Sequence, residues 1–303
     1  MTTPVAAALA ALLSATTDAG AGAPDAAAHA QGIEAWRRER LQRLTADGGW
    51  LTVAGLFWLK PGANRFGAAA DNDIVLPAHS APAQAGTFVL EAGRVRVEMR
   101  GGVTVTLAGR PVMKSALRSD AGGAPPDVLT LGALTLQIID RGGRLGVRLK
   151  DMNSPARAKF QGLQYFPIDA RFRVVARFVP HEKPVAINVP NVLGMVESMP
   201  SPGYASFTIP GAPAAQPLRL DAVLEPGDAQ LFFIFRDATS GKTTYGGGRF
   251  LYADPPAGGK VVLDFNRAYS PPCAFTAHAT CPLPPANNRL PIAVEAGEKF
   301  AGH

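Results

Sequence analysis

Short runs rich in Val, Leu, Thr and Phe, each closed by glycine or proline, follow one another along most of this 303-residue chain. Glycine occurs 32 times and proline 27 times, which supplies the breaks between the runs. Inside the runs apolar and polar residues alternate, as in RVRVEMR (residues 94–100) and ALTLQIID (133–140). Alternation of period two between turn-forming residues is typical of antiparallel strands, whereas a helix needs a period near 3.6. The sequence therefore predicts an all-β fold.

The length and the strand pattern predict two β units. Closely spaced strands from residue 66 to 149 favour a sandwich, and about eight further runs after residue 166 favour an antiparallel barrel or a second sandwich. We expect a signal-like or disordered segment at 1–30, a helix plus sandwich at 31–152, and a barrel-like unit with a Cys/Pro motif at 153–303.

A single helix is expected, just before the first strands. Ile33, Trp36, Leu41 and Leu44 recur at helical spacing until the pair of glycines at 48–49. We expect this helix to cap the first β unit.

The first 30 residues favour export. Residues 5–13 form an apolar stretch of the length of a secretory core, and small residues at 19–23 offer cleavage sites, although the basic start is missing. The alternative is a disordered alanine-rich tail. The expected location is periplasmic or secreted, and no later run is long enough to span a membrane.

Charge and motifs exclude several function classes. The formal net charge is +6, but lysines and arginines are scattered along the strands, so no nucleic-acid partner is expected. The chain has no Walker loop, dinucleotide fingerprint, G-x-S-x-G elbow or H-E-x-x-H helix, which argues against phosphoryl transfer and nicotinamide chemistry. No cofactor and no metal are predicted.

Residues 62–140 resemble the forkhead-associated (FHA) sandwich. The resemblance is carried by Gly67, residues 71–76, Ser80 and Gly132. Ala68 stands where that family places a phosphate-holding arginine, and Ala81 follows the serine where another arginine is usual. Without either guanidinium, a phosphothreonine loses its charge-assisted hydrogen bonds. The resemblance thus implies an FHA-like scaffold, and phosphopeptide binding is not expected.

Polar residues that could carry chemistry gather late in the chain. A triple glycine at 246–248 interrupts an expected strand, which usually marks a bulge or a close approach by a ligand. Asp264 and Asn266 are expected on one strand face, and if that face points inward they converge with Arg249. The alternative is a structural ion pair of Asp264 with Arg249 or Arg267. The candidates are Asp264 and His278 for catalysis, and Tyr245, Arg249, Asn266 and Arg267 for binding.

Cys273 and Cys281 are the only cysteines, and His278 lies between them. A disulfide between them explains both residues in an oxidising compartment and would stabilise by about 2.5 kcal/mol on the chain-entropy model. A reactive thiol beside His278 and a metal site remain alternatives, although a metal site lacks a fourth ligand and a tight C-x-x-C pair.

Several motifs also resemble the bacterial domain-of-unknown-function family numbered 1684. They are GWLTVAGLFWLKPG, DNDIVLP, DATSGKTTYGGGRFLY and, most specifically, DFNRAYSPPCAFTAHATCPLPPANNRLPIAVEAGEK, within residues 36–299. The family has no settled activity. The resemblance implies that the C-terminal motif is its signature, and that Arg249, Asp264, Asn266, Cys273 and Cys281 form a working cluster.

Two functions follow from these patterns. The first is an exported two-domain β protein that binds a small molecule, peptide or glycan in a polar pocket of its C-terminal domain. The second is a hydrolase that uses Asp264 or His278 as general base, with Arg249 and Asn266 at an oxyanion.

Overall fold

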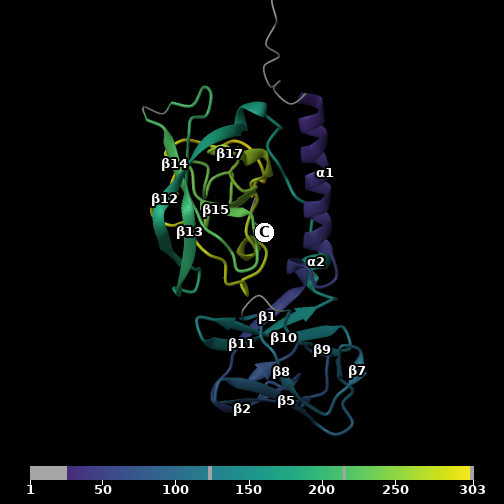
Figure 1. The fold of residues 1–303 in the computed structure, drawn as a ribbon. Coiled ribbons are helices and arrows are strands. Elements are labelled where there is room, and N and C mark those ends of the chain that lie inside the picture. The colour runs from purple at the N-terminus through teal and green to yellow at the C-terminus, as the bar shows by residue number, and fades with distance from the viewer. Residues whose placement is uncertain (1–25, 122–124, 214–215, 301–303) are drawn as a thin grey trace, which may run out of the picture.

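The computed structural model describes residues 26–121, 125–213 and 216–300, and Figure 1 shows two β units with one long helix beside the upper one. The helices are α1 (Ala26–Thr45) and the short α2 (Pro155–Ala158), with single 3-10 turns at η1 (Trp50–Thr52), η3 (Ala170–Phe172), η4 (Phe265–Arg267) and η5 (Pro272–Ala274). The chain is thus mostly β with one N-terminal helix. The predicted signal-like segment lies outside the described residues except for 26–30, which belong to α1.

The N-terminal unit packs two sheets around one core. The six-stranded sheet has the order β1 (Val53–Trp58), β11 (Arg144–Asp151), β10 (Leu134–Arg141), β9 (Val128–Leu131), β6 (Thr106–Leu107) and β7 (Arg110–Pro111). The five-stranded sheet has the order β3 (Ile74–Val75), β2 (Gly62–Gly67), β4 (Gly86–Glu91), β5 (Arg94–Met99) and β8 (Lys114–Leu117). Phe66, Phe88 and Val97 from one sheet meet Leu136 and Val147 from the other in a single buried cluster. Alternation along each strand points these apolar side chains inward.

The C-terminal unit contains a four-stranded and a two-stranded antiparallel sheet. The first has the order β14 (Leu218–Ala222), β13 (Val196–Phe207), β12 (Arg173–Pro190) and β17 (Lys260–Asp264); the second pairs β15 (Leu231–Phe235) with β16 (Arg249–Ala253). Phe178, Phe207, Phe233 and Leu263 lie in the core between them.

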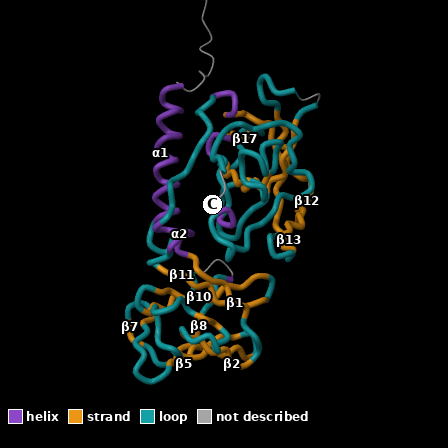
Figure 2. Tube along the Cα trace, turned by 180° about the vertical axis from the view of Figure 1, so that it is seen from behind, coloured by secondary structure: helices purple, strands orange, loops and turns teal. Residues whose placement is uncertain are grey.

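The expected closed barrel is not found among the described strands. Two of the expected strands, RFRVVARFV and PVAINV, belong to the single long strand β12, and the run at 290–296 pairs in no sheet. Prolines at 282, 284, 285 and 291 remove backbone donors along that last stretch, so it cannot complete a ladder. Figure 2 shows the chain after β17 as loop with short helical turns.

Helix α1 packs against the C-terminal unit, whereas the sequence suggested that it caps the first β unit. His29 Nε2 lies 2.6 Å from Asp264 Oδ2, and Arg40 Nε lies 3.2 Å from Glu298 Oε2. Glu298 is fully buried, and a buried carboxylate is costly unless a cation lies beside it. The helix therefore lies where His29 and Arg40 reach two buried acids of the C-terminal unit.

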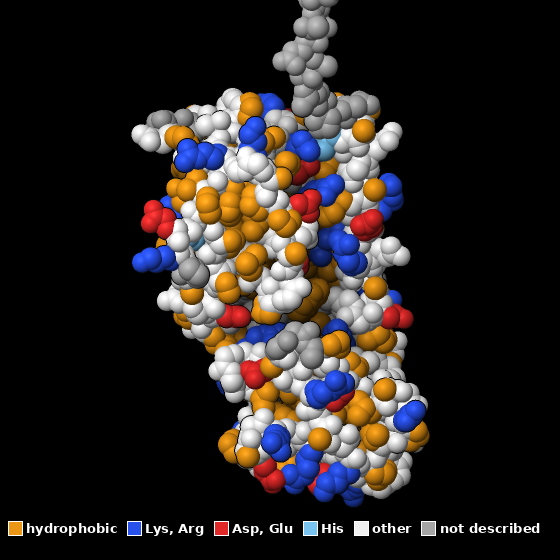
Figure 3. Space-filling view, in the orientation of Figure 1, with side chains coloured by type: hydrophobic (Ala, Val, Ile, Leu, Met, Phe, Trp, Pro, Cys, Tyr) orange, Lys and Arg blue, Asp and Glu red, His pale blue; other side chains and the backbone are white. Residues whose placement is uncertain are grey.

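The surface differs between the two units. Figure 3 shows hydrophobic side chains gathered on the visible face of the C-terminal unit. Val175, Val185, Val196 and Val262, on β12, β13 and β17, are among the exposed apolar residues.

Among the described residues, no helix is long and apolar enough to cross a membrane.

Candidate functional site

Arg249 lies inside the C-terminal unit and binds protein groups. Its side chain is 1% exposed; Nη2 lies 2.5 Å from Asp237 Oδ2 and donates to Val294 O at 2.8 Å, and Nη1 donates to Ala296 O at 2.5 Å. These bonds hold segment 290–296, which belongs to no sheet, against β16. Arg249 thus takes Asp237 as its partner and not Asp264.

Asp264 and Asn266 lie together, as expected, but not on one strand face. Asp264 ends β17, and Asn266 lies in the 3-10 turn that follows, where its backbone N–H and its Nδ2 both donate to Asp264 Oδ1, at 3.2 and 2.9 Å. Asn266 also bonds the backbone of Asp169 in both directions. With His29 on its other oxygen, the Asp264 carboxylate is enclosed by protein donors, and this cluster anchors α1.

The triple glycine forms a turn before β16, where an interrupted strand was expected. Gly248 has φ +102°, and a Cβ there would lie 2.7 Å from Phe235 O, so only glycine fits. Tyr245, just before the glycines, donates through its hydroxyl to Cys273 O at 3.2 Å. Arg267, the last residue of η4, is exposed. None of the ion pairs between described residues includes it.

The two cysteines are free thiols in the structure, so the expected disulfide is not formed there. The 3-10 turn at η5 points the backbone N–H of Cys273 at Cys281 Sγ, 3.0 Å away, which brings the two residues into contact. His278 is half-buried in the same loop, and none of the hydrogen bonds between described residues joins it to Asp264 or to a thiol. Across the described residues, no three His, Cys, Asp or Glu side chains form a group that could hold a metal.

The predicted residues therefore fall into three places. Asp264 and Asn266 share one cluster, Tyr245 joins the two cysteines, and Arg249 is enclosed with Asp237. Which of them touches a ligand stays a prediction.

A pocket of about 350 Å³ opens at a different point of the C-terminal unit, where β12 and β13 lose their register. The pairing of Pro180 with Gly203 is followed by that of Val185 with Ser201, so residues 181–184 bulge out opposite a single residue. Bulges are common beside functional sites because they re-aim side chains. The bulge pocket, as we call it, is lined by His181, Glu182, Lys183, Val185, Pro200, Ser201, Pro202 and Leu224.

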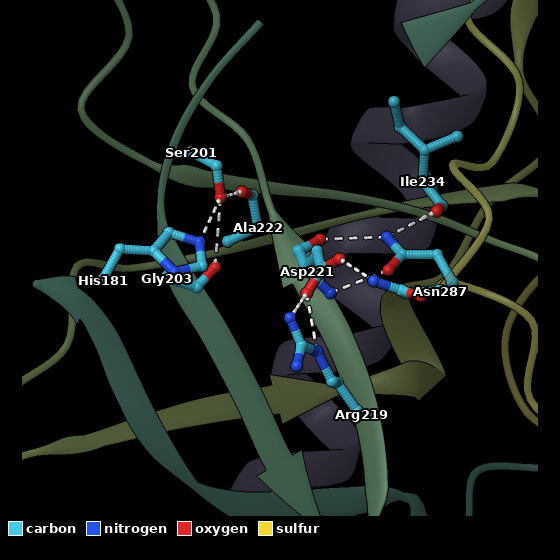
Figure 4. A network of polar contacts seen from close by, with 9 residues as sticks. His181, Ser201, Gly203, Arg219, Asp221, Ala222, Ile234 and Asn287 are labelled. Atoms are coloured by element: carbon cyan, nitrogen blue, oxygen red, sulfur yellow. Dashed lines mark hydrogen bonds and ion pairs between the residues drawn. The ribbon is translucent and has the colours of Figure 1, made fainter. Parts of the chain in front are cut away.

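One hydrogen-bond chain fixes the floor of the bulge pocket. Ser201 Oγ donates to Ala222 O at 2.7 Å, and His181 Nε2 lies 3.2 Å from the same hydroxyl (Figure 4). Since the hydroxyl proton is committed to the carbonyl, the imidazole is the donor to Ser201. The pair is therefore arranged for holding the pocket wall and not for activating the serine as a nucleophile.

A second network behind this wall ties the C-terminal loop to β14. Arg219 Nε and Nη2 contact Asp221 Oδ1 at 2.8 and 2.7 Å, and Asn287 Nδ2 donates to the other carboxylate oxygen at 2.9 Å (Figure 4). Asn288, fully buried, bonds both the N–H and the C=O of Asp221 and the carbonyl of Ile234. The side chains of the two asparagines thus connect the C-terminal loop, which belongs to no sheet, to β14 and β15.

Sequence reasoning did not single out His181, Ser201 or His29. A signal for the first two was available, because Pro180 and Pro184 interrupt an otherwise strand-like run, and proline inside a strand marks a bulge or an edge. No comparable signal marks His29, whose partner Asp264 lies 235 residues away.

Taken together, these features define a β-rich protein of two units, with separate buried polar clusters and an open pocket in the second unit. Residues 158–299 match the family model described as Protein of unknown function (DUF1684). The resemblance was expected over 36–299; the motifs before residue 158 fall outside the matched span.

Solved structures supply partial likenesses. The NMR structure of an uncharacterised protein from Haloarcula marismortui is 36% identical, covers 47% of this chain and 78% of its own, and has a TM-score of 0.39. Neighbours also include the FHA-2 domain of a Mycobacterium tuberculosis ABC transporter (30% identity, 30% of this chain, 77% of that one, TM-score 0.23). The FHA domain of a Chlamydia trachomatis protein is 22% identical, covers 31% of this chain and 81% of that one, and has a TM-score of 0.22. Among curated proteins, no match is found.

Proposed function

We propose that this protein binds a small molecule, a peptide or a glycan in the bulge pocket of its C-terminal unit. The observation that carries the proposal is the pocket itself, whose volume of about 350 Å³ lies in the range of small-ligand sites. Its lining also has the usual composition of such sites, a mainly apolar wall with a few convergent polar groups.

The lining favours a ligand with an apolar body and a polar or anionic end. Val185, Pro200, Pro202 and Leu224 offer apolar contact. Lys183 is exposed at the rim and carries donors for a carbonyl, hydroxyl or carboxylate of the ligand. A rigid floor that is already hydrogen-bonded keeps the entropic cost of binding low.

A titration with chemically defined probes tests this proposal. Aromatic carboxylates, tripeptides and disaccharides are screened by saturation-transfer NMR, and the dissociation constant of each binder is measured for wild type, His181→Ala and Lys183→Ala. Loss of one charge-assisted contact should weaken binding about tenfold. Lys242→Ala, an exposed lysine in a turn away from the pocket, is the matched control and should bind like wild type.

Two results would contradict the proposal. One is that no probe of the three classes binds at millimolar concentration. The other is that a binder keeps its affinity in both pocket variants, which would place its site elsewhere.

Hydrolysis by Asp264 and His278 is the other function that the sequence suggested. It requires both groups to face one cavity with the substrate. The contacts of Asp264 with His29 and Asn266 occupy its carboxylate, and this favours the binding function.

Export is part of the proposal and rests on the apolar stretch at 5–13 alone. Cell fractionation with N-terminal sequencing tests it. Cleavage near residues 19–23 in a periplasmic or secreted fraction is the expected result, and an intact N-terminus in the cytoplasm would contradict it.

A further inference from the structure

A buried arginine without a carboxylate partner lies where the two β units meet. Arg148, on β11, is 5% exposed, and its Nε and Nη2 have no hydrogen-bond partner among the described residues. Its neighbours Val147 and Leu149 point into the N-terminal core, so Arg148 points out of that core. Burial, together with the positive charge of Arg141, lowers the pKa of Arg148 to about 10. A buried cation without a partner is costly, so an anion beside Arg148 would stabilise the protein.

The groups around Arg148 identify that anion. Its guanidinium stacks 5.0 Å from the ring of Trp50, which packs in the same apolar cluster as Cys273 and Cys281. Asp120, a carboxylate whose charge acts on Arg148, is held by both terminal nitrogens of Arg141 at 2.9 Å and is therefore already neutralised. Arg148 interacts electrostatically with Cys281. The acidic group available to it is thus the thiol pair.

The two thiols are placed to share one proton. Cys281 Sγ accepts the N–H of Cys273 at 3.0 Å, and Tyr245 lies over the same loop with its hydroxyl 3.2 Å from Cys273 O. The hydrogen bond from the Cys281 thiol lowers the pKa of Cys273, while the pKa of Cys281, which keeps the proton, is raised. Cys273 is half-buried and Cys281 buried, so Cys273 is the one that a reagent reaches.

We propose that Cys273 and Cys281, beside Arg148, form a reactive dithiol site that exchanges with low-molecular-weight disulfides. Cys273 is the attacking thiolate, Cys281 is the resolving thiol, and Arg148 is the counter-charge of the monoanionic pair. The site is distinct from the bulge pocket and does not depend on the binding function.

The exchange balances in two steps. The Cys273 thiolate attacks one sulfur of a small disulfide RSSR, which forms a Cys273–SR bond and releases RS⁻. Cys281 then loses its proton to solvent and attacks Cys273 Sγ, which forms the Cys273–Cys281 disulfide and releases a second RS⁻. The protein is oxidised by two electrons and RSSR is reduced to two thiolates. Oxidation removes the anion beside Arg148.

The test uses the chromogenic disulfide dithiobis(nitrobenzoate) on the reduced full-length protein. Wild type should release two equivalents of thionitrobenzoate and lose the mass of two hydrogen atoms. Cys281→Ser should release one equivalent and keep the reagent's thiol as an adduct, and Cys273→Ser should react at least tenfold more slowly than Cys281→Ser. In wild type, the pH profile of the first step should have its midpoint below the pKa of an ordinary thiol.

Arg148→Met tests the counter-charge. Its first step should be about tenfold slower at neutral pH, which corresponds to one pKa unit. Arg144→Met, an exposed arginine on the same strand, is the matched control and should react like wild type. If Arg148→Met does not fold, the wild-type pH profile and the two serine variants still decide. Equal rates for the two serine variants, a stable mixed disulfide in wild type, or a wild-type midpoint at or above that of a free thiol would each overturn the proposal.

Discussion

Replacing Arg249 with methionine should strongly lower the free energy of unfolding of the protein. The change removes one ion pair to Asp237 and two bonds to the carbonyls of Val294 and Ala296, all in a fully buried place. Asp237 then keeps only the donors of Thr239 and remains as a buried charge. Breaking one side of such a pair typically costs 3–5 kcal/mol, so we expect the free energy of unfolding to fall by about 4 kcal/mol.

Urea unfolding followed by circular dichroism measures this loss. Arg118→Met is the matched control, because Arg118 is 71% exposed and solvent screens its pair with Asp127, so this variant should unfold nearly like wild type. The double variant Arg249→Met with Asp237→Leu should recover about 2 kcal/mol, since it leaves no unpaired charge. A loss below about 1 kcal/mol for the single variant, or no recovery in the double one, would refute the reasoning.

Three further changes probe the same interior. Burial raises the pKa of Glu298, so the folded state holds its proton more tightly, and stability present at low pH is lost as the pH rises through the folded-state pKa. Glu298→Gln should lack this loss, so its unfolding free energy relative to wild type, measured between pH 4 and 8, should increase with pH; parallel curves would contradict it. Gly248→Ala should cost about 2 kcal/mol in the same urea assay, because its Cβ would lie against Phe235 O; an unchanged midpoint would disprove the clash. His29→Ala should speed amide exchange in the first turns of α1 by releasing Asp264, and unchanged protection by mass spectrometry would exclude that role.

The strands of this protein could be predicted where each run buries one face. The runs at 94–100 and 133–140 alternate because one side meets the shared core of the sandwich, and both form strands. The run at 290–296 also buries apolar residues but joins no sheet: it has backbone bonds to Arg236 and Ala238, and its carbonyls at 294 and 296 accept from a side chain, Arg249. The composition of a run indicates that its side chains are buried, but it does not indicate which groups form hydrogen bonds with its backbone N–H and C=O groups.

The candidate site was predictable only in part for the same reason. Asp264 and Asn266 are neighbours in sequence, so their contact follows from local geometry. The partners that decide their chemistry come from remote segments, His29 for Asp264 and Asp237 for Arg249. The bulge at 181–184 depends on how β12 and β13 pair, and in the sequence it is marked by the prolines at 180 and 184.

The position of α1 has a consequence for how the polypeptide matures. The helix is synthesised well before the acid that it contacts at position 298, and the whole sandwich is synthesised between the two. The sandwich can fold during synthesis, while Arg40 of the helix stays solvated until Glu298 has been made. A protein trimmed to residues 158–299 would lack that helix and leave Glu298 without its cation, so the matched span depends on a helix that precedes the sandwich in the chain.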